Sequence, residues 1–252
     1  DVDHGRTEFP VSGTQIRSDF RKFWLDMPEV VRAGLFRKIV IIGSESSGTS
    51  TLASDLAEAM KSPLVAEVGR TISWELAIEH DGMENVDWNE DVFWRVLREQ
   101  ADAESSARSH NCDAIPGEFG PWIVCDTDAV ATVVWWERYL EENSNAAWSF
   151  AQTGLGDLYV VTDPEDVVFF QDGIRDGEHL RLDMHNSFLE VAIKITGKLI
   201  AVNKIKILAK PSAVKINLAF KLKIQSASKL ATPLNAILNA SAIITTLDPI
   251  AM

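Results

Sequence analysis

The hydrophobic pattern of the first 190 residues alternates between short apolar runs and longer stretches with helical spacing. Short runs rich in β-branched residues predict four strands, at residues 38–42, 64–68, 122–125 and 158–162. Strands that alternate with helices in this way are typical of βαβ units around a buried parallel sheet. The pattern therefore predicts an α/β layer fold.

The stretches between these runs carry helix and loop signals. A leucine or methionine recurs every four residues in residues 50–61, and residues 87–90 resemble a capping box that begins a helix through Arg108. A third helix is predicted at residues 129–140. Residues 109–121 hold two prolines and two glycines, which predicts a loop before the third strand.

Charge divides the chain near residue 190. The net charge of −13 splits into −21 before this point and +8 after it, where lysine is the basic residue and arginine and tryptophan are missing. We interpret residues 36–190 as one domain and residues 191–252 as a compositionally distinct basic tail. Two interpretations of the tail remain open: a divergent or out-of-frame extension, which we favour, and a basic amphipathic module for a partner or an anionic surface.

Composition also excludes several functions. An acidic chain without a basic stripe lacks the footprint of a nucleic-acid-binding protein. No apolar stretch reaches the roughly 18 residues of a membrane span. Two cysteines and the lack of a signal peptide predict a cytoplasmic protein without a disulfide framework. His110, His179 and His185 have no metal-ligand spacing with these cysteines, so no zinc site is expected.

A glycine-rich loop follows the first predicted strand and precedes a predicted helix. Backbone N–H groups of such a loop cradle phosphates at a helix N-terminus, and a hydroxyl, here that of Ser50, ligates Mg²⁺. Thr49 occupies the position where the G-x-x-x-x-G-K-[ST] motif has lysine. The alternative is a glycine-rich turn without a nucleotide. The predicted ATP-binding residues are Gly43, Ser44, Glu45, Ser46, Ser47, Gly48, Thr49, Ser50 and Thr51.

These motifs carry a resemblance to a known family. Residues 43–52 resemble the phosphate loop of the ribosylnicotinamide kinase domain in bifunctional NAD-salvage proteins, and residues 65–70, 124–128 and 162–164 are similar to its strand ends. Residues 171–177 resemble its lid. The resemblance covers residues 36–190 and implies a P-loop nucleoside-kinase-like parallel sheet flanked by helices. It also implies the phosphorylation of nicotinamide riboside to nicotinamide mononucleotide with ATP and Mg²⁺.

Residues 11–17 resemble a different motif, the serine-x-threonine-x-x-arginine signature of nucleotidyltransferases such as nicotinamide mononucleotide adenylyltransferase. In that family Ser12, Thr14 and Arg17 would contact ATP phosphates, but the upstream H-x-G-H motif is missing here. We interpret residues 1–33 as the remnant of a nucleotidyltransferase domain, and the chain as a fragment of a longer protein. No adenylyltransferase activity is expected from it.

Phosphoryl transfer to a hydroxyl requires a carboxylate for the acceptor and a metal site. Glu67 and Asp126 end predicted strands, at the sheet edge where ligands bind in open α/β folds. We favour Glu67 as the base and Asp126, with Ser50, as the Mg²⁺ partner. Asp128 is assigned to a ribose hydroxyl of the substrate, with a helix N-cap as the alternative. Arg70 either binds the substrate or pairs with Glu67.

Cations near the transferring group are the remaining requirement. Arg175 and Arg181 lie in a glycine-flanked polar stretch, where they would close over the triphosphate and partly replace the missing lysine. Alternatively they pair with nearby acids on a solvated surface. Trp135 and Trp136 are candidates for stacking a nicotinamide ring, but a core position is favoured. A second functional class also stays open: a catalytically weak nucleotide-binding module that senses ATP or NAD.

Overall fold

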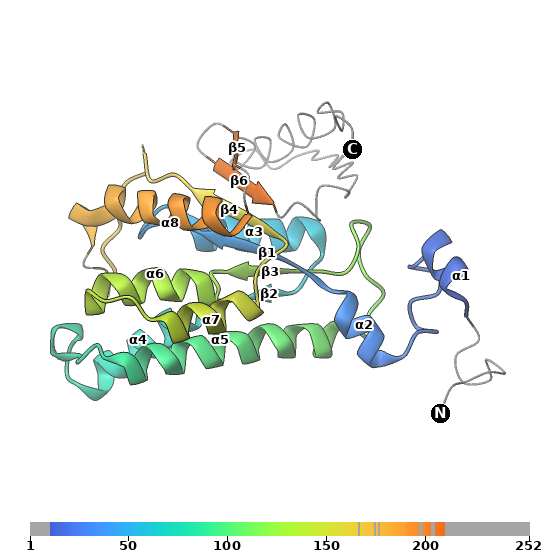
Figure 1. Ribbon diagram of the computed structural model, residues 1–252, viewed down its shortest axis with the longest axis horizontal. Helices are drawn as coiled ribbons and strands as arrows, with labels where there is room; N and C mark the ends of the chain where they lie inside the picture. The colour runs from blue at the N-terminus through green and yellow to red at the C-terminus, as the bar shows by residue number, and fades with distance from the viewer. Residues whose placement is uncertain are drawn as a thin grey trace.

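The computed structural model describes residues 11–165, 167–173, 175, 177–196, 199–202 and 205–209. These residues form one sheet covered by helices on both faces (Figure 1). The predicted α/β class, with a parallel sheet flanked by helices, is confirmed.

The strands are ordered β2-β3-β1-β4-β6-β5 across the sheet. The first four pair in parallel, whereas β6 is antiparallel to both β4 and β5. Their bounds are β1 Arg37–Ile42, β2 Leu64–Val65, β3 Trp122–Asp126, β4 Leu158–Thr162, β5 Leu199–Val202 and β6 Ile205–Ala209. All four predicted strands are present, although β2 is shorter than residues 64–68 because Glu67 already caps the next helix.

The helices divide between the two faces because side chains alternate along each strand. Ile39 and Ile41 of β1 pack with α3 on one face, and Val40 and Ile42 pack with α5, α6, α7 and α8 on the other. The helices are α1 Gly13–Ser18, α2 Glu29–Leu35, α3 Thr49–Met60, α4 Val68–Glu79, α5 Glu90–Asn111, α6 Ala129–Leu140, α7 Asn145–Thr153 and α8 Arg181–Thr196, with short 3-10 turns at Met83–Asn85 and Glu178–Leu180. The predicted capping box is displaced, since Asn89 rather than Asp87 caps α5.

Helix α8 continues across the compositional boundary near residue 190. Phe188 and Ala192, on either side of that boundary, are both buried in the core. The strands β5 and β6 lie beyond it and extend the sheet. The sequence analysis missed this pair, although two β-branched runs separated by two residues are a hairpin signal. Residues 210–252 of the basic tail lie outside the described residues.

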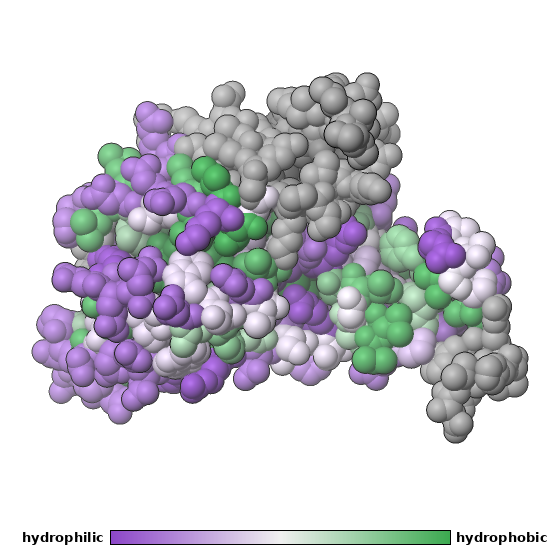
Figure 2. Space-filling view, viewed as in Figure 1, coloured by the Kyte–Doolittle hydropathy of each residue, from purple (hydrophilic) through white to green (hydrophobic). Residues whose placement is uncertain are grey.

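Residues 20–35 are anchored on the C-terminal end of α5. The indole of Trp24 is fully buried and donates a hydrogen bond to the carbonyl of Cys112 at 2.7 Å. Figure 2 shows apolar residues gathered over α2, among them exposed Val30, Val31 and Leu35. Upstream, Ser12 of the nucleotidyltransferase-like motif forms a capping box with Gln15 at α1. Across the described ranges, the longest apolar helices fall short of what a membrane crossing requires.

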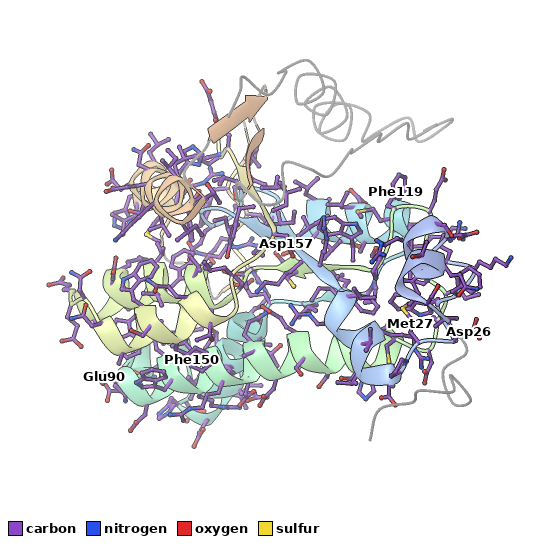
Figure 3. The ribbon with its side chains drawn as sticks, turned by 45° about the vertical axis from the view of Figure 1, so that its right-hand side comes forward. Asp26, Met27, Glu90, Phe119, Phe150 and Asp157 are labelled. Carbon is purple, nitrogen blue, oxygen red and sulfur yellow. The ribbon has the colours of Figure 1, made fainter. Side chains whose placement is uncertain are left out.

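A buried charge network joins the sheet to two helices. The Lys38 side chain on β1 is 2% exposed, and its Nζ lies 2.6 Å from Glu104 Oε2 of α5 and 3.7 Å from Asp128 Oδ2. Tyr159 of β4 donates its hydroxyl to the same Asp128 oxygen at 2.6 Å. Burial alone would lower the pKa of Lys38, but the attraction of Asp128 and Glu104 outweighs it and the pKa is raised. The Lys38 backbone N–H also donates to the carboxylate of Asp157 at 2.9 Å, and Figure 3 labels Asp157 beside the central strands.

Lys38→Met should destabilise the fold by about 3–5 kcal/mol, because it leaves the Glu104 carboxylate buried without its cation. Urea denaturation measures the free energy of unfolding. The double variant Lys38→Met/Glu104→Leu should recover a large part of the loss, since both members of the pair are then apolar. Equal stability of Lys38→Met and the wild type would contradict the assigned role.

Candidate functional site

The glycine loop between β1 and α3 is held in one conformation by close packing and by left-handed residues. A Cβ on Gly43 would lie 2.1 Å from Thr162 Oγ1 and 2.6 Å from Ser47 Oγ, so only glycine fits there. Gly48 has φ of 87° and caps α3, a backbone conformation that glycine adopts without strain. Ser47 donates to the carbonyl of Ser44 at 2.6 Å. The loop is therefore preformed for ligand binding.

A cavity of about 190 Å³ lies between this loop and the carboxyl ends of β1 and β3. Eight of the nine predicted ATP-binding residues, all except Ser47, line it on the side of the loop and the start of α3. The other walls come from α4, α6 and the β4–α8 connection. The lining includes Gly43, Ser44, Glu45, Ser46, Gly48, Thr49, Ser50, Thr51, Glu67, Arg70, Asp126, Thr127, Trp135, Phe170 and Arg175. The first N–H groups of α3 have no intrahelical acceptor, and together with the helix dipole they favour an anion at this end.

Asp126 lies at the end of β3 beside the first turn of α3. It is 6% exposed and accepts hydrogen bonds from the hydroxyls of Ser50 and Thr49. Burial raises the pKa of Asp126, and the two hydroxyl hydrogen bonds oppose that rise. A carboxylate and a hydroxyl held together at a phosphate-sized cavity are the oxygen ligands that Mg²⁺ prefers. The two predicted metal-site residues are thus brought together, and they fit a divalent cation.

The residue after Asp126 has a strained backbone. Thr127 has φ of 78°, which is rare for a β-branched residue and costs on the order of 1–3 kcal/mol. Its N–H binds the carbonyl of Ile41 at 2.9 Å, so the sheet holds the turn in place. This turn directs Asp126 and Asp128, two residues apart, to different surroundings.

Asp128 is the helix cap and not a substrate contact. Its side chain is fully buried, and one carboxylate oxygen accepts from the N–H groups of Val130 and Ala131 at the start of α6. The other oxygen binds Tyr159 and faces Lys38. With both oxygens used inside the protein, the predicted ribose contact is corrected in favour of the N-cap alternative.

Glu67 stands at the start of α4, where β2 ends. Its side chain keeps 29% of its surface exposed, yet enclosure by protein raises its pKa to about 7, and the negative charge of Asp126 adds to the rise. Arg70 opposes it from 3.4 Å. A carboxylate that titrates near neutrality is suited to exchange a proton with a substrate hydroxyl.

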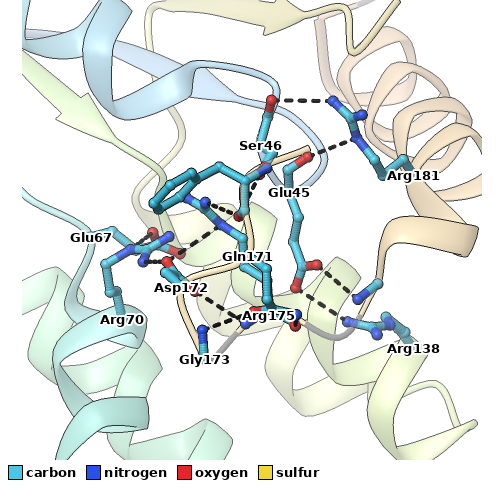
Figure 4. Close-up of polar contacts among 12 residues, drawn as sticks. Glu45, Ser46, Glu67, Arg70, Arg138, Gln171, Asp172, Gly173, Arg175 and Arg181 are labelled. Atoms are coloured by element: carbon cyan, nitrogen blue, oxygen red, sulfur yellow. Dashed lines mark hydrogen bonds and ion pairs between the residues drawn. The ribbon is translucent and has the colours of Figure 1, made fainter. Parts of the chain in front are cut away.

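Two arginines meet the β4–α8 connection at Asp172 (Figure 4). Arg70 Nη1 lies 2.6 Å from Asp172 Oδ2, and Arg175 Nε lies 3.6 Å from the same oxygen. Arg175 also donates to the carbonyl of Phe170 at 2.7 Å, and both arginines line the cavity. The predicted pairing of Arg70 with Glu67 is present, and Asp172 is a further partner that the sequence analysis did not weigh for it.

Arg181 does not line the cavity that the loop forms. Its guanidinium donates to the loop carbonyls of Glu45 at 3.1 Å and Ser46 at 3.2 Å, and to the carbonyl of Val167 at 3.0 Å (Figure 4). These contacts stabilise the loop from behind. The structure places Arg181 against the loop backbone, and its predicted contact with the triphosphate stays a prediction.

A second cavity of about 110 Å³ adjoins the first. Four aromatic residues lie in its walls: Trp88 and Tyr139 stack with ring centroids 4.9 Å apart, and Phe93 and Trp135 lie beside them, while the rest of the lining is polar, charged or aliphatic. The favoured core position is right for Trp136, which is fully buried, but Trp135 lines both cavities. The residues shared by the two cavities are Glu45, Glu67, Arg70, Thr127, Trp135 and Arg175.

The sequence analysis missed part of this aromatic pocket. Trp135 and Tyr139 are four residues apart on α6, a spacing that places both on one helix face, and this signal was available. Trp88, which precedes the cap of α5 and stacks on Tyr139 across the pocket, had no local signal because the contact is made between distant segments.

Comparisons with known proteins place the chain in a family. The model of the AAA domain family matches residues 38–207, more than half of the chain. The trifunctional NAD biosynthesis/regulator protein NadR of Escherichia coli (strain K12) is 39% identical over 69 residues, which are 27% of this chain and 17% of that protein. The NadR of Salmonella typhimurium matches equally, so the aligned part is a small share of these relatives.

Two solved structures share the fold. A NadR protein in complex with NR matches with a TM-score of 0.59 and 23% identity, over 79% of this chain and 54% of that one. A NadR protein in complex with NAD and AMP-PNP matches with a TM-score of 0.55 and 20% identity, over 77% and 52%. The chain thus spans about half of these relatives. The resemblance to the NAD-salvage family is confirmed: the chain belongs to the AAA domain family and is similar to NadR.

Proposed function

We propose that this domain transfers the γ-phosphoryl group of ATP to the 5′-hydroxyl of nicotinamide riboside and forms nicotinamide mononucleotide. One observation carries the proposal: Glu67, with a pKa of about 7, lines both the phosphate-loop cavity and the aromatic pocket. A riboside whose ring stacks in the aromatic pocket would present its hydroxyl at this border. The solved NadR complexes with NR and with AMP-PNP support the two ligands.

Each group has a defined role in this proposal. The loop N–H groups and the start of α3 bind the phosphates, and Trp135 and Tyr139 orient the riboside ring. Glu67 accepts the hydroxyl proton as the oxygen attacks the γ-phosphorus, and the bond to the β-phosphate oxygen breaks. Ser50 and Asp126 would hold Mg²⁺, which would neutralise charge on the transferring phosphates.

The loop lacks its lysine, so other cations must face the phosphates. Arg70 and Arg175 line the cavity, and their guanidinium groups form charge-assisted bonds with phosphate oxygens as readily as with the Asp172 carboxylate. Arg175 is the better replacement for lysine at Thr49, because Arg70 is also engaged by Glu67. If Arg175 exchanged its Asp172 partner for the triphosphate, its guanidinium would lie at the γ-phosphate.

The experiment that tests this function is ADP formation by the purified chain with ATP, Mg²⁺ and nicotinamide riboside. Adenosine as acceptor and a mixture without acceptor are the controls. Riboside-dependent turnover is expected. ATP binding without turnover would instead favour the second candidate, a nucleotide-binding module that senses ATP or NAD. The observation that favours this candidate is Thr49 at the lysine position of the loop motif.

The rate should depend on pH through Glu67. A general base acts in its ionised form, so kcat/KM should rise as pH increases through about 7 and fall below it. Glu67→Gln should lower kcat by roughly 10²–10⁴-fold and abolish this dependence. Glu75→Gln, on the exposed side of α4, is the matched control and should keep the wild-type profile. An unchanged pH profile in Glu67→Gln would assign the base to another group.

Gly43→Ala should disturb the loop, since its Cβ meets Thr162 and Ser47. We expect a loss of about 1–3 kcal/mol of stability and a weakening of ATP binding by at least roughly tenfold, measured by thermal unfolding and calorimetry. Gly34→Ala on α2 is the control, because nothing lies within 4 Å of its added Cβ. It should stabilise the helix slightly and leave ATP affinity unchanged. Normal ATP affinity in Gly43→Ala would contradict the assignment of the loop.

A further inference from the structure

Arg138 of α6 lies between the phosphate loop and the aromatic pocket without lining either cavity within the described ranges. On one side, its Nη1 lies 3.8 Å from Glu45 Oε1 of the loop. On the other side, its guanidinium carbon lies 4.5 Å from the ring centroid of Tyr139 and 5.4 Å from that of Trp135. One side chain, 11% exposed, thus contacts groups from both halves of the site.

Glu45 is itself tied to the beginning of the α8 region. Its Oε2 accepts the N–H of Gly177 at 2.9 Å (Figure 4). A Cβ on Gly177 would approach Glu45 Oε2 to 2.9 Å and Arg138 Nη2 to 3.2 Å, so the three residues are closely packed. A displacement of the Glu45 carboxylate would therefore change its contact with Arg138.

We propose that Arg138 is a positioning residue, through which nucleotide at the phosphate loop orders Trp135 and Tyr139 in the aromatic pocket. The inference rests on the proposed function for the identity of the two ligands. The Glu45–Arg138 separation of 3.8 Å is about 1 Å longer than a close charge-assisted hydrogen bond. A triphosphate in the cavity that Glu45 lines repels its carboxylate, and Arg138 is the cation placed to receive it.

The rings respond because the guanidinium is held on their faces by cation–π attraction, worth about 0.5–2 kcal/mol per contact. As Arg138 closes on the Glu45 carboxylate, the rings of Trp135 and Tyr139 follow the guanidinium and keep that contact. Their shift sets the walls of the pocket that would take the acceptor. The nucleotide and the acceptor should then bind with positive coupling, which is reciprocal.

The test follows tryptophan emission while a non-hydrolysable ATP analogue with Mg²⁺ is added to the chain. Trp135→Phe identifies the part of the signal that belongs to Trp135. Arg138→Met keeps the length of the side chain and removes its charge. Arg138→Lys keeps the charge but lacks the planar group that stacks. Arg98→Met is the matched control, since Arg98 makes the same kind of contact with Trp94 at 5.5 Å, a ring that lines neither cavity.

The wild type and Arg98→Met should show a nucleotide-dependent change in Trp135 emission. Arg138→Met should lose it while calorimetry gives an analogue affinity within about threefold of the wild type, and Arg138→Lys should keep part of it. The analogue should tighten nicotinamide riboside binding about tenfold in the wild type and less than about threefold in Arg138→Met.

A full emission change in Arg138→Met, or none in the wild type, would overturn the inference. A wild type that binds no riboside but shows the Arg138-dependent emission change would refute the proposed acceptor and leave the positioning role standing. The two proposals therefore fail separately.

Discussion

The placement of the site depends on one buried cation. Lys38 is the second residue of the central strand β1, and its charge is balanced by Glu104 of α5 and Asp128 at the start of α6. Two charges removed from water are stable only when they are paired and hydrogen-bonded, so this network fixes α5 and α6 against the sheet. Asp128 then caps α6 from inside, and α6 carries Trp135, Tyr139 and Arg138 to the site.

The same constraint separates two neighbouring carboxylates. Asp128 is directed into the core, while the strained Thr127 turns the chain so that Asp126 reaches the hydroxyls of Thr49 and Ser50. Asp126 in turn adds negative charge beside Glu67 and helps to raise its pKa. The strained backbone of Thr127 thus helps to hold Asp126 near Glu67 in a partly desolvated place. There the pKa of a carboxylate is raised toward 7.

Much of the fold was predictable, because β1, β3 and β4 are buried on both faces and read as continuous apolar runs. The loop, Glu67 and Asp126 were also found from the sequence, since strand ends and glycines mark them locally. Prediction from the sequence failed where contacts between distant segments determine a residue's role. Asp128 could have been a substrate contact or a helix cap, and its burial against Lys38 and Tyr159 makes it the cap. Arg181 had the right charge, but it binds loop carbonyls that no sequence pattern reveals.

Because the domain is acidic, an anionic nucleotide depends on the few cations near the loop. Arg181 donates to loop carbonyls, and Arg138 contacts Glu45 and two aromatic rings. In the described structure, the guanidinium groups that line the cavity are those of Arg70 and Arg175. Both meet on Asp172. A triphosphate carries more charge than this carboxylate and offers more oxygens in fork geometry, so it competes well for both arginines. Arg70 also pairs with Glu67 and stabilises its ionised form. The arginine that lines the phosphate cavity is therefore also the one that favours ionisation of the candidate base.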